Sequence, residues 1–261
     1  MGSHNGRLIV AGGANFPTAP PWQGGEKAWH DTVFALDPSA TAWRNAGELD
    51  APRAYGAAVS TRHGIALIGG NDSGRAYDTC QLLVIDQTTL RARFEALPPL
   101  PARTAFPAAA ASGDTIYVAA GSDGTDPTAM THAFWSLDLA AEPRTWTSLP
   151  AWPGPARHKA VAAIQSNGSA NSFYLFSGEI PTRSEAAELS YDYRTDAYRF
   201  DLKRGSWQQL SDLPTPVAAA CAMATGQSHI LIFSGSTGKH VQDPDPRPEF
   251  PRVVRSYHTI T

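Results

Sequence analysis

The stretch LIVAGGANFPTAPPWQGGEKAWHDTVFALD at residues 8–37 joins two apolar runs through a long loop rich in Pro, Gly and Trp. The first run ends at the glycine pair Gly12-Gly13, and the second ends at Asp37. Short runs of β-branched and aromatic residues bounded by Gly, Pro and Asp are typical of β-strands. The stretch therefore predicts a strand, a polar loop and a second strand. Whether it is one unit of a larger fold depends on whether the pattern recurs.

The pattern recurs along the whole chain. Five apolar runs close on a glycine: LIVAGG (8–13), IALIGG (65–70), IYVAAG (116–121), FYLFSG (173–178) and ILIFSG (230–235). The closing residues Gly13, Gly70, Gly121, Gly178 and Gly235 are 57, 51, 57 and 57 residues apart. A period of this length marks a repeat architecture.

Each repeat contains the same further parts. After the glycine comes a polar loop and a second short run, as in FALD (34–37), LVID (83–86), WSLD (135–138) and YRFD (198–201). A run with Trp or Phe and a proline-containing turn before small residues complete the repeat, as in PRAYGAAVS (52–60) and PARHKAVAAI (155–164). Four short strands in about 50 residues predict an all-β, kelch-type β-propeller. We expect the Trp residues to pack between adjacent blades.

The two ends of the chain interrupt this pattern. The first repeat opens at the apolar run 8–13, which corresponds to a second strand, so we expect no inner strand ahead of it. The fifth repeat reaches the RSYHT run (255–259) in the place of the third strand, and the sequence ends at Thr261. We therefore expect one kelch propeller domain over residues 1–261, with five recognisable blades and incomplete at both ends.

Composition excludes several classes of partner. Lys and Arg number 21 against 24 Asp and Glu, so the chain lacks the basic excess of a nucleic-acid binder. No apolar run approaches the roughly 20 residues of a membrane-spanning helix, and no charged start followed by an apolar run opens the sequence, so we expect no membrane span and no signal peptide in this chain. Cys80 and Cys221 are too few for a disulfide framework and fit no metal-ligand spacing, so each is expected to be a small buried residue. We expect no metal and no cofactor.

Three arginines precede inner strands. The turns place Arg53, Arg103 and Arg157 at positions taken as equivalent in successive blades. Three guanidinium groups near one axis would form a positive funnel that binds a carboxylate. The alternative is structural, with each arginine bonding backbone carbonyls between blades.

The loops that follow the glycines supply further candidates. The first long loop holds Asn15, Lys27 and His30 among tryptophans, a mixture that suits sugar binding. The alternative is that its aromatic rings only cap the mouth of the propeller. Asp72 lies in the corresponding loop after Gly70. We expect it either to contact the substrate or to be a solvated loop charge.

A carboxylate follows the fourth strand-end glycine directly. Glu179 comes after Gly178, with Arg183 and Arg194 further along the chain. A carboxylate beside a guanidinium can act as general acid or base toward a sugar hydroxyl, which makes Glu179 and Arg194 the catalytic candidates. The alternative is again a solvated loop charge.

Several segments resemble one bacterial enzyme family. VAGGANFP, PWQGGEKAWHDTVFALD, PPLPARTAFPAAAASGDTIYVAAG, RTDAYRFD and FPRVVRSYHTIT are similar to the cyclically permuted N-acetylneuraminate epimerases, and the likeness extends over essentially the whole chain. The resemblance implies a six-bladed kelch propeller, periplasmic or extracellular, that interconverts the α and β anomers of sialic acid without metal or organic cofactor. It also implies a carboxylate that moves protons during ring opening and an arginine that holds the sugar's carboxylate.

The chain departs from this family at its catalytic blade. The family's Glu and Arg pair follows a Tyr-His-Thr stretch, which here is Tyr257-His258-Thr259, two residues from the end of the sequence. Glu179 and Arg194 imitate the pair in a different blade, and the resemblance therefore implies five blades of six. Two further hypotheses stay open: a non-catalytic kelch module that binds carbohydrate or protein, and a galactose-oxidase-like copper enzyme. The sequence leaves the oligomeric state open.

Overall fold

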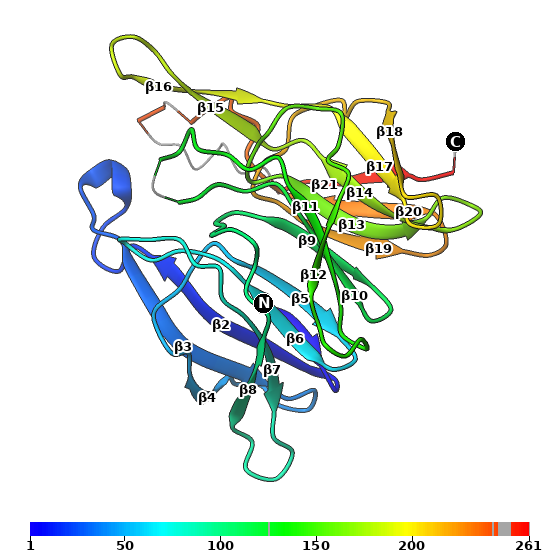
Figure 1. Ribbon diagram of the computed structural model, residues 1–261. Coiled ribbons are helices and arrows are strands. Elements are labelled where there is room, and N and C mark those ends of the chain that lie inside the picture. Colours follow the sequence, from blue (N-terminus) through cyan, green and yellow to red (C-terminus); the bar gives the residue numbers. More distant parts are fainter. Residues whose placement is uncertain (125, 242, 245–251, 261) are drawn as a thin grey trace.

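The computed structural model describes residues 1–124, 126–241, 243–244 and 252–260. Its described residues form 21 strands and one short 3-10 helix, Pro21–Gln23. The strands are grouped in five blades (Figure 1), which confirms the predicted all-β propeller. No helix in the described ranges has the length and apolar character needed to span a bilayer.

The first three blades are antiparallel four-stranded sheets. Blade one contains β1 (Gly2–His4), β2 (Arg7–Asn15), β3 (Ala28–Leu36) and β4 (Arg44–Glu48). Blade two contains β5 (Ala57–Thr61), β6 (Gly64–Ile68), β7 (Cys80–Ile85) and β8 (Ala92–Leu97). Blade three contains β9 (Ala108–Ser112), β10 (Thr115–Ala119), β11 (Phe134–Asp138) and β12 (Trp146–Leu149).

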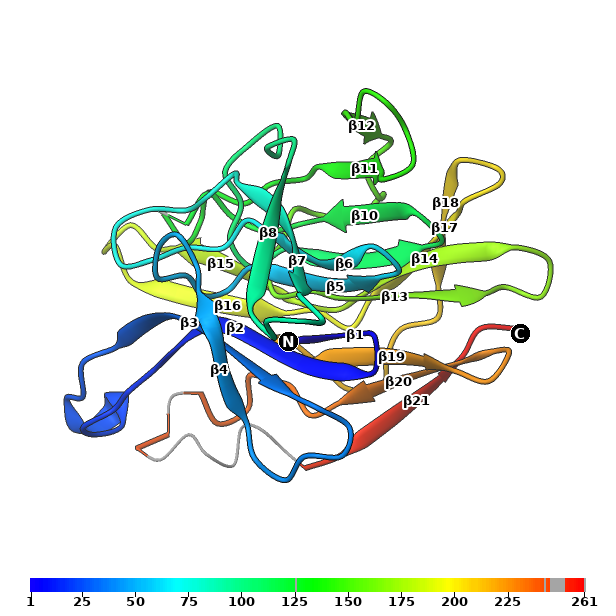
Figure 2. The ribbon, with the colours of Figure 1, turned by 90° about the horizontal axis from the view of Figure 1, so that it is seen from below.

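The last two blades vary this plan. Blade four contains β13 (Val161–Ser166), β14 (Asn171–Phe176), β17 (Ala197–Asp201) and β18 (Ser206–Leu210). Its loop between β14 and β17 forms a separate hairpin of β15 (Glu179–Arg183) and β16 (Leu189–Tyr193). Blade five contains β19 (Cys221–Thr225), β20 (His229–Phe233) and β21 (Val254–His258). In both views the β15–β16 hairpin and the β2–β3 loop extend from the same end of the propeller (Figures 1 and 2).

The prediction that no inner strand precedes residue 8 was wrong. The segment Gly2–His4 forms β1 and pairs with β2, with Ser3 opposite Leu8. The three residues have no strand-like composition, but the free edge of β2 offers them backbone hydrogen bonds. The Ser3 amide also donates to Oγ of Ser60 on β5 at 2.8 Å, which attaches β1 to the next blade.

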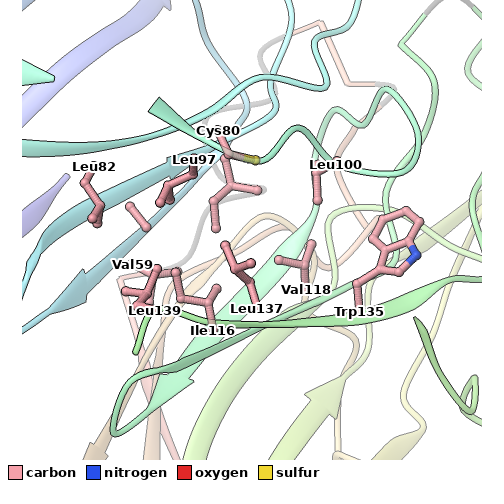
Figure 3. Close-up of a cluster of buried hydrophobic side chains, with 12 residues drawn as sticks. Val59, Cys80, Leu82, Leu97, Leu100, Ile116, Val118, Trp135, Leu137 and Leu139 are labelled. Carbon is pink, nitrogen blue, oxygen red and sulfur yellow. The ribbon is translucent and has the colours of Figure 1, made fainter. Parts of the chain in front are cut away.

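Apolar side chains fill the spaces between neighbouring blades. Between blades two and three, the cluster in Figure 3 joins Leu82 and Leu97 to Ile116 and Leu137. Nε1 of Trp146 crosses this boundary and donates to the Pro98 carbonyl at 2.9 Å.

A tryptophan crosses the next boundary in the same way. Nε1 of Trp207 in blade four donates to the Pro150 carbonyl of blade three at 2.6 Å. The predicted packing of Trp between blades is therefore confirmed at these two boundaries. Trp43 of blade one is instead 44% exposed.

The two cysteines differ in their surroundings. Cys80 begins β7 and is buried, and burial raises the pKa of its thiol to about 12. Cys221 begins β19 and is exposed, so the prediction of a second buried cysteine was wrong. Burial lowers the pKa of the Met1 amino group.

Two sets of backbone hydrogen bonds join consecutive blades near the axis. In the first, the strand-end glycine of one blade donates to the turn before the inner strand of the next blade. These bonds are Gly13 N to Arg53 O at 2.7 Å, Gly70 N to Thr104 O at 2.8 Å, Gly121 N to Arg157 O at 2.9 Å and Gly178 N to Val217 O at 3.2 Å.

The second set links the turns to one another. Phe106 N donates to Tyr55 O at 2.7 Å, Lys159 N to Phe106 O at 3.3 Å and Ala219 N to Lys159 O at 2.9 Å. Each of these four residues has a positive φ, between 54° and 57°. We call Tyr55, Phe106, Lys159 and Ala219 the axial turn residues. Because they occupy one repeated position, their side chains are presented at the same end of the propeller.

Substituting a junction glycine tests this arrangement. Gly121 has φ +113°, and a Cβ built on it would lie 2.5 Å from Thr104 Cγ2 and 2.8 Å from Ala105 O. Gly13 has the similar φ of +111°, and its Cβ would meet nothing within 4 Å. Both alanine variants carry the strain of a positive φ, about 1–2 kcal/mol, but only Gly121→Ala adds a steric clash of about 1–3 kcal/mol. We expect urea unfolding to show the larger loss of stability for Gly121→Ala, and equal losses would contradict the junction model.

Candidate functional site

The axial turns bring together a row of rings and one cation. The ring centres of Tyr55 and Phe106 are 4.7 Å apart, and those of Phe106 and His158 are 5.3 Å apart. Nζ of Lys159 lies 5.4 Å from the centre of the Phe106 ring, within the range of a cation–π interaction. Bulky residues with positive φ are uncommon, and such strain clusters at functional sites. The row is therefore a candidate site on geometric grounds.

Glu179 lies buried beneath this row. Its Oε1 is 2.5 Å from Nζ of Lys159 and 3.1 Å from Nε2 of His158, while its side chain is only 2% exposed. Two backbone bonds between His158 and Glu179, of 3.0 and 3.2 Å, fix the start of the β15–β16 hairpin against the turn. Burial alone would raise the pKa of Glu179, but His158 and Lys159 together hold that pKa below its ordinary value. The carboxylate is thus ionised at neutral pH.

A solvent-open pocket of about 170 Å³ adjoins this cluster. It is lined by Phe106, Ser122, Gly124, Pro127, His158, Lys159 and Tyr191. The lining offers an aromatic wall, an ammonium group and two hydroxyl groups. Such a mixture of an apolar surface and a few polar groups is typical of a small-molecule site. We call it the Lys159 pocket.

The first long loop adds a second ammonium group to the row. Nζ of Lys27 lies 5.0 Å from the ring centre of Tyr55 and 5.5 Å from that of Trp29. Asn15 Oδ1 and His30 Nε2 are 2.9 Å apart, so these two predicted binding residues contact each other. Of the three candidates in this loop, Lys27 is the one that the structure brings to the axial row.

Arg157 is fully buried and occupied within its own blade. Its two Nη atoms donate to the Asp196 carboxylate, with Nη2 to Oδ2 at 2.8 Å, and Nη1 also donates to Ser177 O at 3.0 Å. The Arg157 and Asp196 side chains are 0% and 6% exposed. Arg157 is therefore engaged by a carboxylate and a carbonyl of its own blade, and not by carbonyls of a neighbouring blade as the structural alternative had it.

The prediction that Arg103 is equivalent to the other two arginines was wrong. The Gly70 amide bonds Thr104 O, as the Gly121 amide bonds Arg157 O, so Thr104 holds the equivalent position. Arg103 precedes it by one residue and is exposed. Arg53 does hold the equivalent position, where its side chain is 6% exposed and its guanidinium carbon lies 4.4 Å from the ring centre of Tyr77.

The side chains of Arg194 and Asp72 are paired with groups other than Glu179. Nη1 of Arg194 donates to Asp192 at 2.8 Å, and this hydrogen bond raises the pKa of Arg194. In the described part of the chain, the ion pairs of Glu179 are with His158 and Lys159. Asp72 accepts a 2.5 Å hydrogen bond from Tyr77 Oη, which lowers the pKa of the carboxyl group, and it also accepts amide hydrogen bonds within its own loop.

Tyr55, Phe106, His158 and Lys159 were not among the residues predicted to bind a ligand. Tyr55 and Lys159 follow Arg53 and Arg157 by two residues in the same turns. The signal that could have found them is a bulky side chain at a fixed distance before each inner strand. Among the described residues, no group of three or more His, Cys, Asp or Glu side chains has the geometry to hold a metal ion.

Comparisons with known proteins agree with the resemblance seen in the sequence. The family model for N-acetylneuraminate epimerase matches residues 97–243, more than half of the chain. The N-acetylneuraminate epimerase of Pasteurella multocida (strain Pm70) is 38% identical over 99 residues, which cover 33% of this chain and 26% of that protein. The N-acetylneuraminate epimerase of Escherichia coli (strain K12) is 30% identical over 165 residues, which cover 60% of this chain and 41% of that protein.

The fold is also similar to that of a solved structure. The structure of YjhT superimposes with a TM-score of 0.73 over 97% of this chain and 82% of that one, at 17% sequence identity. The aligned segments span less than half the length of the two curated relatives. On the extent of the family match, this chain belongs to the N-acetylneuraminate epimerase family.

Proposed function

We propose that the chain binds N-acetylneuraminate in the Lys159 pocket and interconverts its anomers. The observation that carries this proposal is the contact between Lys159 and the buried carboxylate of Glu179. That contact fixes an ammonium group at the wall of an open pocket, between an aromatic ring and the hairpin residue Tyr191. Membership of the N-acetylneuraminate epimerase family supports the choice of substrate.

The pocket and its surroundings suit a sugar acid. N-acetylneuraminate carries a carboxylate, which the ammonium groups of Lys159 and Lys27 attract. Phe106 and Tyr55 offer ring faces for the apolar side of a pyranose. Ser122 and Tyr191 line the Lys159 pocket. Their hydroxyl groups can form hydrogen bonds with the hydroxyl groups of the sugar.

The chemistry needs proton transfer at two oxygens. As the ring opens, the anomeric hydroxyl loses its proton, the bond between the anomeric carbon and the ring oxygen breaks, and the ring oxygen gains a proton. In our proposal the Lys159 ammonium group protonates the ring oxygen, and the hydroxyl proton returns through water to the Lys159 amine. Closure on the other face of the carbonyl reverses these steps and gives the second anomer.

Glu179 acts in this proposal through Lys159. Its side chain is too deeply buried to reach a ligand directly, at 2% exposure. Its negative charge and short contact hold Nζ in place, so Glu179 is a positioning residue. Arg194, the other catalytic candidate, is bonded to Asp192 and has no part in this scheme.

Anomer exchange measured by NMR tests the proposal. With freshly released α-N-acetylneuraminate and little buffer catalysis, we expect the protein to accelerate exchange. Lys159→Met should reduce the protein-dependent rate by about 10²-fold or more, the usual contribution of a general acid or base. Lys203→Met, which removes an exposed lysine on the β17–β18 turn, should leave the rate unchanged.

The outcomes separate catalysis from binding. No acceleration, with ligand shifts still visible at Tyr55 and Phe106, would overturn the mutarotase proposal and favour the non-catalytic carbohydrate module. Equal rates for wild type and Lys159→Met would place the chemistry elsewhere. If the two residues act as a unit, we expect Glu179→Gln and Lys159→Met to reduce the protein-dependent exchange rate by a similar factor.

Stability as a function of pH tests the charge state of Glu179. Because the folded-state pKa of Glu179 is depressed, its stabilising contribution is complete above the unfolded pKa and is lost as pH falls through the folded pKa. We expect the unfolding free energy of wild type, measured by urea at pH 7 and stepwise below pH 4.5, to fall more steeply than that of Glu179→Gln. Parallel curves would mean that the pKa of Glu179 is the same in the folded and the unfolded protein, which would contradict the depressed folded-state pKa.

A further inference from the structure

Two backbone hydrogen bonds define a repeated pair of positions in blades two to five. The turn position is the residue whose carbonyl accepts a hydrogen bond from the strand-end glycine amide of the preceding blade. The strand position lies just before or at the start of the third strand, and its carbonyl accepts an amide from the end of the second strand. These second bonds are Gly69 N to Thr79 O at 3.0 Å, Ala120 N to Ala133 O at 3.2 Å, Ser177 N to Asp196 O at 2.9 Å and Ser234 N to Val253 O at 2.9 Å.

In three blades the two positions hold either two oppositely charged residues or two uncharged residues. Blade four has Arg157 and Asp196, which are joined by the buried ion pair described above. The uncharged pairs are Thr104 with Ala133 in blade three and Val217 with Val253 in blade five. In none of these three blades does the pair leave a buried cation without a carboxylate.

Blade two differs from the other three blades. It has Arg53 at the turn position but Thr79 at the strand position, so the guanidinium lacks the carboxylate that Asp196 supplies to Arg157. Nη2 of Arg53 donates to Asp50 at 3.0 Å, and the Asp50 side chain is 65% exposed. Nε and Nη1 of Arg53 are buried, and no described residue forms a hydrogen bond with them. Buried N–H groups without acceptors are costly, so Nε and Nη1 favour the binding of a further acceptor beside Arg53.

An open pocket of about 220 Å³ lies at this mismatch. Its lining includes Arg53, Arg75, Arg103, Tyr77 and Thr79. The Tyr77 ring contacts two of the guanidinium groups, whose central carbons lie 4.4 and 4.9 Å from its centre. Asp50 and Asp78 also line the pocket, so three cationic groups face two carboxylates.

We propose that this pocket binds a small carboxylate, whose oxygens take the place beside Arg53 that Asp196 takes beside Arg157. The ligand class follows from the fourth blade, where the same arginine position is satisfied by a carboxylate. The pocket shares no lining residue with the Lys159 pocket. The proposal therefore does not depend on the mutarotase activity.

The substitution Thr79→Asp tests the proposal by supplying the missing carboxylate from the protein itself. The full chain is melted in sodium acetate and in sodium chloride of equal ionic strength. For wild type we expect saturating acetate to raise Tm by roughly 2–4 °C over chloride. For Thr79→Asp we expect a higher Tm in chloride and no further rise with acetate. Thr79→Val is the matched control, which should keep the acetate response.

Each other outcome counts against the proposal. Wild-type Tm that is indifferent to acetate would overturn it, as would an acetate response that survives in Thr79→Asp. A response to phosphate with none to acetate would identify a phosphate site and overturn the assignment to carboxylates. Anomer exchange by Thr79→Asp should equal that of wild type, which keeps this test distinct from that of the Lys159 pocket.

Discussion

The structure depends on the backbone hydrogen bonds that join each blade to the next at the axis. A strand-end glycine donates to the turn of the following blade, and a side chain at Gly70, Gly121 or Gly178 would collide with backbone atoms of the turn that opens its own blade. The same junction holds the axial turn residues at positive φ. Because the turns are fixed in this way, the side chains of Tyr55, Phe106 and Lys159 form one row. The candidate site is thus a by-product of how the blades are joined.

The fold could be predicted from the sequence because its strongest constraint is visible there. A glycine is required at each junction, and the period of the glycines therefore reveals the number of repeats. The strand β1 could not be predicted, since its pairing depends on the free edge of β2 and not on its own residues. The β15–β16 hairpin was missed for a similar reason, because it lies in a polar loop and is held by bonds between Glu179 and His158.

The site was less predictable than the fold, because it depends on register and burial. Arg103 and Thr104 are neighbours in sequence, and only the bond from Gly70 decides which of them holds the repeated position. Glu179 was found from its place after a glycine, but its burial and its contact with Lys159 could not be read from that place. Arg157 and Arg53 look alike in sequence. They differ because Asp196 pairs with Arg157, whereas Thr79 holds the corresponding position in the blade of Arg53.

The linkage of the axial turns also bears on how the molecule opens. Each of the four described junctions couples two blades, so blades two, three and four each belong to two junctions, whereas blades one and five each belong to one. In repeat architectures, such nearest-neighbour coupling makes local stability depend on the number of intact interfaces. Amide hydrogen exchange would then be slowest in the central blades and faster toward β1 and β21, in cooperative steps of one blade. The Lys159 pocket is lined by residues of blades three and four, each of which belongs to two junctions.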